Sequence, residues 1–232
     1  YGEGSSIIQE RTHSVALKST IWLLDPRPNL ETIVKTVEKS FELSEISHTP
    51  VMMQLRIRTC HLQGKFATKN NKKPEISKIN KVTNVAPQNY DLIAHPPSTY
   101  AQEQLKYGQR LGLAEKYIIE ESLNEMQEGS IKDIGLIVQG GLYNNLISAL
   151  QEMSLSDELG NSKISIYILN VVHPIIPEEV INYAKKFKGI LIIEEGQPPY
   201  IEQEVGLLLH KSKIEIEIRG KDILPMAGEY TS

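Results

Sequence analysis

The fold is decided by residues 134–141, which read Ile134-Gly135-Leu136-Ile137-Val138-Gln139-Gly140-Gly141. Such a near-continuous apolar run is typical of a parallel strand that is covered on both faces. The two glycines then turn the chain, and apolar residues at helical spacing follow at Leu142, Leu146 and Leu150. This strand–turn–helix unit predicts an α/β fold.

The same alternation of strand and helix continues to the C-terminus. Strands are predicted at residues 164–169, 190–193 and 214–219, and helices are predicted from Pro177 and around residues 201–209. The last strand alternates isoleucine with charged residues, as a half-exposed edge strand does. Together with a long helix that starts at Ser98, these elements predict a complete parallel-sheet domain at residues 98–232.

The N-terminal part reads as a shorter strand–helix–strand unit. Residues 21–26 and 51–58 are predicted strands, and Asn29 is a suitable N-cap for the helix between them. The expected buried stripe of this helix is Leu30, Ile33, Val34, Val37, Phe41 and Leu43. Two strands and one helix do not close a sheet, so residues 1–66 are predicted to be the C-terminal part of a larger domain. Residues 67–97, which are polar, basic and proline-rich, are the predicted linker.

Composition excludes several classes of protein. The chain has 232 residues, 40% hydrophobic and 23% charged, with a formal net charge of −4. Its single cysteine, Cys60, rules out internal disulfides and an iron–sulfur cluster held by this chain alone. The negative charge argues against nucleic-acid binding, and no apolar run has the length of a membrane helix. Since the first residues also lack a signal peptide and an initiator methionine, we expect an internal piece of a cytoplasmic protein.

A polar cluster near the N-terminus is one candidate site. Ser5 and Ser6 lie in a glycine-rich turn whose backbone N–H groups suit a phosphate or carboxylate. Gln9 and Arg11 follow, and the guanidinium of Arg11 is suited to bidentate binding of a carboxylate. A solvent-exposed loop that begins a helix explains the same residues and stays open as the alternative.

A second candidate site lies where predicted parallel strands end. Gly140 and Gly141 follow one strand, and Glu194, Glu195 and Gly196 follow another. Both turns are expected at the sheet edge where α/β domains bind ligands or partners. The alternatives are a tight turn for the glycines and helix N-terminal charges for the two glutamates.

Several of these segments, in this order, resemble a known family. They are Tyr1–Thr12, Leu24-Asp25-Pro26, Thr49-Pro50-Val51, Gly135–Gly141, Ile192–Gly196 and Arg219–Pro225. They resemble the thiamine-diphosphate-dependent 2-oxoacid:ferredoxin oxidoreductases, and above all the large subunit of the indolepyruvate-specific members. The resemblance implies the end of a pyrimidine-binding domain, followed by a domain like the C-terminal domain of transketolase. One departure is Ile7-Ile8, an apolar pair where the family has polar residues.

The resemblance also implies an activity, namely oxidative decarboxylation of an aryl-pyruvate such as indolepyruvate to an acyl-CoA, with electrons passing to ferredoxin. In that family thiamine diphosphate with Mg and iron–sulfur clusters take part. This chain would then supply one wall of the cofactor or substrate pocket at Ser5, Ser6, Gln9 and Arg11, and would bind none of these groups alone. The implied partners are the remaining domains, a second (beta) subunit, ferredoxin, coenzyme A and further copies in a homo-oligomer.

Two other classes of protein stay open at this point. One is a thiamine-diphosphate enzyme without electron transfer, such as a 2-oxoacid decarboxylase. The other is a non-catalytic structural or dimerisation module.

Overall fold

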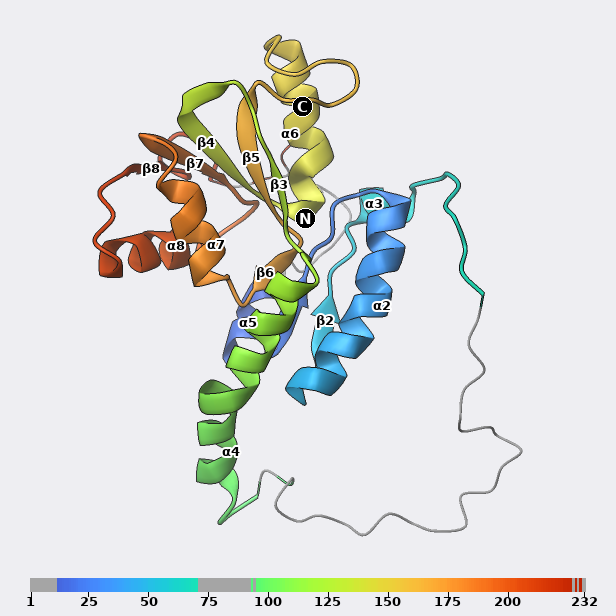
Figure 1. Ribbon diagram of the computed structural model, residues 1–232, viewed down its shortest axis with the longest axis vertical. Coiled ribbons are helices and arrows are strands. Elements are labelled where there is room, and N and C mark those ends of the chain that lie inside the picture. Colours follow the sequence, from blue (N-terminus) through green and yellow to red (C-terminus); the bar gives the residue numbers. More distant parts are fainter. Residues whose placement is uncertain (1–11, 71–92, 94, 227, 229, 231–232) are drawn as a thin grey trace.

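The computed structural model describes residues 12–70, 93, 95–226, 228 and 230, and it contains two sheets that lie side by side (Figure 1). The larger sheet has five strands in the order β3-β5-β4-β7-β8, and the smaller has three in the order β2-β1-β6. Both sheets contain parallel strands, which confirms the predicted α/β class.

The five-stranded sheet contains the predicted C-terminal strands. Its strands are β3 (Glu125–Gln127), β4 (Ile131–Gln139), β5 (Ile164–Leu169), β7 (Gly189–Ile193) and β8 (Glu217–Arg219). β4 pairs in parallel with both β5 and β7, and β7 pairs in parallel with β8, the predicted edge strand. β3, which the sequence did not indicate, pairs antiparallel with β5 at the other edge.

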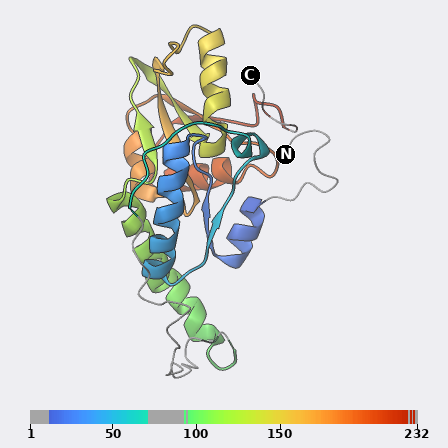
Figure 2. The ribbon, with the colours of Figure 1, turned by 90° about the vertical axis from the view of Figure 1, so that its right-hand side faces the viewer.

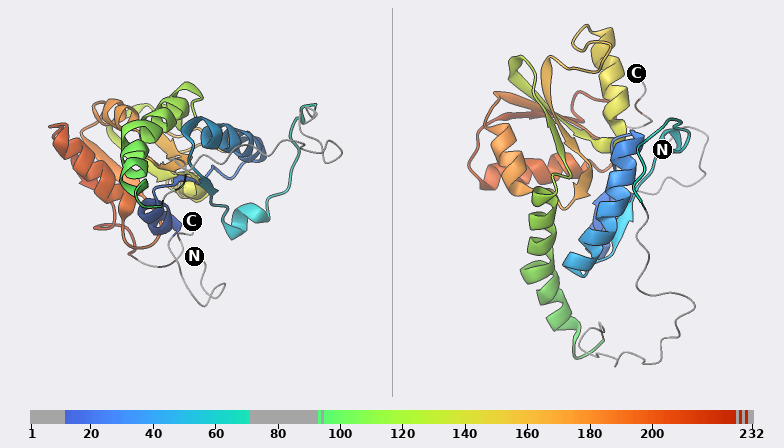
Figure 3. Two further views of the ribbon diagram at one scale, coloured as in Figure 1. Left: turned by 90° about the horizontal axis from the view of Figure 1, so that it is seen from below. Right: turned by 45° about the vertical axis from the view of Figure 1, so that its right-hand side comes forward.

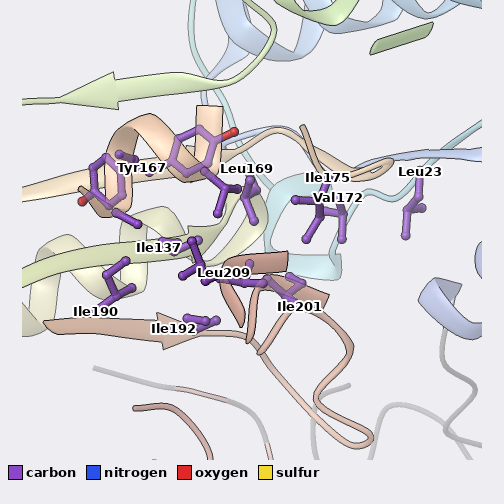
Figure 4. Packing of buried hydrophobic residues seen from close by; sticks show 14 of the residues in the cluster. Leu23, Ile137, Tyr167, Leu169, Val172, Ile175, Ile190, Ile192, Ile201 and Leu209 are labelled. Carbon is purple, nitrogen blue, oxygen red and sulfur yellow. The ribbon is translucent and has the colours of Figure 1, made fainter. Parts of the chain in front are cut away.

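Helices cover both faces of this sheet (Figure 1). α6 (Tyr143–Glu152) lies on one face, and α7 (Pro177–Ala184) and α8 (Tyr200–Lys211) lie on the other. Successive residues of β4 point to opposite faces of the sheet, so Leu136 packs with α6 whereas Ile137 packs with α7 and α8. Figure 4 shows the second of these clusters from close by.

The three-stranded sheet joins distant parts of the chain. β1 (Trp22–Leu24) pairs in parallel with β2 (Val51–Met53) and antiparallel with β6 (Val171–His173). α1 (Thr12–Ser19) and α2 (Leu30–Ser47) flank its two faces (Figure 2). β6 follows β5 after a single residue, so the two sheets are directly connected.

The predicted division into residues 1–66, a linker at 67–97 and residues 98–232 stays a prediction. The two outer parts nevertheless share one buried cluster, in which Trp22 and Leu43 pack with Ile118 and Val171. Nothing in the described helices has both the length and the apolar character needed to cross a bilayer.

The ends of α2 agree with the sequence. The side-chain oxygen of Asn29 accepts hydrogen bonds from the backbone N–H groups of Glu31 and Thr32, at 3.0 and 3.2 Å. His48 ends the helix in the left-handed conformation, with φ 48°. The predicted N-cap is therefore confirmed.

The predicted buried stripe of α2 is correct at Leu43 but wrong at Val37 and Phe41. The helix buries Thr36, Leu43 and Ser47, whereas Val37 and Phe41 are 39% and 72% exposed. The physical reason is the width of the sheet beneath the helix. Because β2 is the edge strand of this sheet, no strand in the described residues lies beyond it to cover Val37 and Phe41. Leu30, at the start of the helix, is instead approached by Gly64, where an added Cβ would lie 2.9 Å from Leu30 Cδ1.

The predicted strand at residues 51–58 is too long. β2 ends at Met53, and a short helix, α3 (Ile57–Cys60), follows. The backbone N–H of Gln54 makes a last bond to the carbonyl of Leu24, at 2.7 Å. β1 stops there because Pro26 has no N–H to continue the ladder.

The long helix predicted from Ser98 is present in three pieces. α4 (Thr99–Leu105) passes through a π-helical turn at Lys106–Arg110 into α5 (Leu111–Glu120), and α4 projects beyond both sheets (Figure 3). Ser98 precedes the helix but makes no side-chain cap hydrogen bond. α5 packs beside α2, where the Tyr117 hydroxyl donates to Glu42 at 2.5 Å.

Candidate functional site

The two candidate sites differ in what the structure says of them. Ser5, Ser6, Gln9 and Arg11 lie outside the described residues, so their proposed role as a pocket wall stays a prediction. The residues of the second candidate site are described, and they lie together at one edge of the five-stranded sheet.

This edge is the switch point of the sheet. β4 lies between β5 and β7: the strand that follows it in sequence, β5, pairs on one side of it, and β7 pairs on the other side. Gly140 and Gly141 follow β4, and Glu194 and Glu195 follow β7, its hydrogen-bonded neighbour. The two turns are therefore neighbours in the structure, at the place where α/β sheets usually bind ligands.

A buried ion cluster occupies this edge. The guanidinium of Arg56 donates through Nη1 to Glu195 and through Nη2 to Asp25, the latter at 3.3 Å. The side chains of Asp25 and Glu195 are each 1% exposed, and that of Arg56 is 13% exposed. One cation therefore bridges two buried carboxylates, one from the end of β1 and one from the end of β7.

Burial and charge oppose each other in this cluster. Burial raises the pKa of the Asp25 carboxyl, and the positive charge of Arg56 limits that rise. Burial alone would lower the pKa of Arg56, but the charges of Asp25 and Glu195 hold it above its usual value. Arg56 is therefore charged, and its positive charge compensates the two buried carboxylates.

The two glycines make room for this cluster. A Cβ on Gly141 would lie 2.4 Å from both Arg56 Nε and Asp25 Oδ1. A Cβ on Gly140 would lie 2.0 Å from the carbonyl oxygen of Asp25. Their role in the described structure is close approach between the two sheets, which favours the tight-turn alternative over a phosphate cradle.

The two glutamates have separate structural tasks. The carboxylate of Glu194 accepts hydrogen bonds from the backbone N–H groups of Ile201 and Glu202, at 3.1 and 2.8 Å, and so stabilises the start of α8. Glu195 binds Arg56 and also accepts from the backbone N–H of Tyr230, at 2.9 Å. Gly196 turns the chain between them and α8, with φ 77°. The helix-terminal charge alternative therefore holds for Glu194, whereas Glu195 serves an ion pair.

The sequence prediction missed three members of this edge. In the sequence, Asp25 and Arg56 lie within the predicted strands 21–26 and 51–58, and no local pattern marks them as a pair. No local pattern marks Asn170 either, although its side chain joins the sheets by accepting from the N–H of Arg27 at 2.8 Å and donating to the carbonyl of Leu123 at 2.9 Å. The usable signal was a charged residue directly after a short apolar strand, as at Asp25-Pro26.

Chemically, the cluster is a closed cross-link. Asp25 and Glu195 both accept hydrogen bonds from the Arg56 guanidinium, and Glu195 also accepts from the backbone N–H of Tyr230. In the described part of the chain, no group of three or more His, Cys, Asp or Glu residues could hold a metal ion.

No family model matches the chain. It is 23% identical to the indolepyruvate oxidoreductase subunit IorA of Methanothermobacter marburgensis, in an alignment 226 residues long that covers 96% of this chain and 34% of that protein. It is 24% identical to the IorA subunit of Pyrococcus horikoshii, in an alignment 235 residues long that covers 98% of this chain and 34% of that protein. The chain thus spans about one third of the length of the curated relatives it matches.

One solved structure supports the fold. It is the 2-oxoglutarate:ferredoxin oxidoreductase from Magnetococcus marinus, which aligns with a TM-score of 0.51 and 10% identity over 90% of this chain and 39% of that chain. The chain is therefore similar in sequence to the IorA subunits of indolepyruvate oxidoreductase and in fold to a 2-oxoacid:ferredoxin oxidoreductase, as the resemblance implied.

Proposed function

We propose that this chain works as part of a 2-oxoacid:ferredoxin oxidoreductase that acts on an aryl-pyruvate such as indolepyruvate. The observation that carries the proposal is the similarity to IorA subunits over at least 96% of the chain. In the reaction, a 2-oxoacid loses CO2, its acyl group is transferred to the thiol of coenzyme A, and two electrons pass to ferredoxin.

The chain's own contribution is positional. The ion cluster of Asp25, Arg56 and Glu195 fixes the edges of two sheets against each other, next to the switch point. The N-terminal residues Ser5, Ser6, Gln9 and Arg11 would add one wall of the pocket. Thiamine diphosphate with Mg and the iron–sulfur clusters would be bound by other parts of the enzyme.

The proposed partners follow from the same assignment. They are the rest of the subunit, a second (beta) subunit, ferredoxin and coenzyme A, in a homo-oligomer in the cytoplasm. Polypeptides that supply the cluster cysteines are needed in any case, because this chain contains a single cysteine.

The test is an activity measurement on the assembly that contains this chain. The assembly is purified anaerobically through a tag, and reduction of methyl viologen is followed with indolepyruvate, with and without coenzyme A. We expect reduction that requires both compounds and stops when thiamine diphosphate is removed. Decarboxylation without coenzyme A or an electron acceptor would contradict the proposal and indicate a non-redox thiamine enzyme. Absence of both reactions in an intact assembly would indicate a structural module.

A further inference from the structure

The segment that follows β8 returns to the switch point. β8 is an edge strand of the five-stranded sheet, and β7 lies between it and β4. Further along the chain, Leu224 and Tyr230 pack on the apolar cluster that the sheet shares with α6. Tyr230 also bonds to Glu195, which follows β7, and to Asn145 in α6. The segment therefore runs from the edge of the sheet back to the ends of its central strands.

The backbone of Tyr230 bridges the two sides of the switch point. Its N–H donates to Oε1 of Glu195 at 2.9 Å, and its carbonyl accepts from the side-chain amide of Asn145. Glu195 belongs to the turn after β7, whereas Asn145 lies in the first turn of α6, which follows the turn after β4. One residue of the chain thus lies where an α/β sheet usually holds a ligand.

The side chain of Tyr230 is attached as well. Lys221 Nζ lies 2.5 Å from the Tyr230 hydroxyl and 4.5 Å from the centre of its ring. The hydroxyl donates in turn to the carbonyl of Pro225 at 2.7 Å. Lys221 is 8% exposed, and its backbone N–H donates to Glu202 of α8 at 2.8 Å. Tyr230 is therefore bound at its backbone and at its hydroxyl.

The chain between Lys221 and Tyr230 has little else to hold it. Ile223 and Met226 are 60% and 62% exposed, and Pro225 is exposed too. Segments with few buried contacts open locally at a small cost in free energy. The position of this segment therefore depends mainly on the bonds of Tyr230.

Glu195 connects these bonds to the ion cluster. Its Oε2 accepts from the guanidinium of Arg56, and its Oε1 accepts from the N–H of Tyr230. Because the side chain of Glu195 is 1% exposed, loss of Arg56 would leave a buried charge without compensation. Such a carboxylate takes up a proton or turns towards solvent, and either change weakens the bond from Tyr230.

We propose that the segment that carries Pro225 and Tyr230 is a strap across the switch point, and that Glu195, held by Arg56, keeps this strap in place. The contact between the two sheets and the closure of the switch point are then coupled, since both use the carboxylate of Glu195. Release of the strap frees the donor groups that Asn145 and Lys221 now direct at Tyr230. The inference does not depend on the proposed function, because it concerns this chain alone.

The experiment measures hydrogen exchange of the Tyr230 amide in the full chain by nuclear magnetic resonance. This amide reports on the strap directly, because it is the donor to Glu195. Arg56→Met removes the cation that holds Glu195. A hydrogen bond to a charged group contributes about 1.5–3 kcal/mol, and each 1.4 kcal/mol corresponds to about tenfold in an equilibrium constant. We therefore expect the Tyr230 amide to exchange at least about tenfold faster in Arg56→Met.

The matched control is Leu43→Ala. Leu43 is fully buried beside Trp22, so its truncation lowers the global stability by an amount similar to that of Arg56→Met while the ion cluster stays intact. Exchange through unfolding of the whole chain would be faster in both variants, whereas release of the strap is specific to Arg56→Met. We expect a change of less than about twofold in Leu43→Ala. Circular dichroism checks that each variant is folded.

Three results would overturn the inference. The first is a Tyr230 amide that exchanges equally fast in the wild type and Arg56→Met. The second is the same acceleration in Arg56→Met and Leu43→Ala. The third is wild-type exchange at the rate of an unstructured peptide, since no strap would then be in place. If Arg56→Met does not fold, Arg56→Lys replaces it, because lysine keeps the charge but not the fork. An increase of about threefold is then expected, and an unchanged rate overturns the inference.

Discussion

Replacing Arg56 with methionine removes the one cation of the buried cluster while keeping a side chain of similar length. In the native structure Arg56 binds the carboxylates of Asp25 and Glu195, each 1% exposed. The variant leaves both carboxylates buried without their counter-charge. Removing one partner from a buried ion pair costs about 3–5 kcal/mol, because the remaining charge loses its compensation. We expect a loss of that size in the free energy of unfolding.

The assay is urea unfolding followed by circular dichroism, with a linear extrapolation to water. The matched control is Lys116→Met, because Lys116 forms an exposed pair with Glu120 at 3.7 Å on α5. Exposed pairs of this kind contribute about 0.3–0.5 kcal/mol, so the control should unfold almost like the wild type. A second variant, Arg56→Lys, keeps the charge but not the fork that reaches two carboxylates, and its stability should fall between those of the wild type and Arg56→Met.

The loss should also depend on pH. Burial raises the pKa of Asp25, and Arg56 opposes the rise, so its removal raises that pKa further. Unfolded Asp25 keeps its ordinary pKa of 3.8. Above that value the folded variant binds more protons than the unfolded chain, and its stability falls as the pH rises. The deficit of Arg56→Met should therefore be larger at pH 8 than at pH 5. A deficit below about 1 kcal/mol at pH 8, or one that shrinks as the pH rises, would refute the reasoning.

Three further predictions use the same unfolding measurement. Gly141→Ala should lower the free energy of unfolding by about 1–3 kcal/mol, because its Cβ would lie 2.4 Å from Arg56 Nε. The control Gly206→Ala lies in α8 with nothing within 4 Å of the added Cβ, and it should raise that free energy by about 0.5–1 kcal/mol. Equal effects of the two substitutions would argue against the close approach at Gly141. Asn29→Ala should cost about 1 kcal/mol through loss of the α2 cap, and an unchanged urea midpoint would contradict that role. Burial lowers the pKa of His173 to about 4, so the folded chain binds fewer protons than the unfolded chain between pH 4 and 6.5 and loses stability as the pH falls. His173→Phe should reduce that loss, and the same pH dependence in both proteins would exclude His173 as its source.

Local patterns were sufficient where each element carried its own signal. The apolar run before Gly140 predicted β4, Pro177 predicted the start of α7, and Asn29 predicted the start of α2. These signals work because strand burial, the fixed φ of proline and a side-chain cap are properties of a few adjacent residues.

The sequence-based predictions failed where the structure of a segment depends on residues that are distant in sequence. The stripe with Phe41 has helical spacing, but spacing cannot say whether a sheet extends beneath it. Likewise β6 consists of Val171–His173, a continuation of β5 in sequence that pairs with β1 in space. The ion cluster is of the same kind, since 31 residues separate Asp25 from Arg56 and 139 separate Arg56 from Glu195.

The position of this cluster limits what the chain can contribute to the proposed reaction. Asp25 follows β1 and Glu195 follows β7, so Arg56 fixes two different sheets to each other at the switch point. Both carboxylates accept from the guanidinium of Arg56, and Glu195 also accepts from the backbone N–H of Tyr230. Their contribution is therefore to the geometry of the switch point.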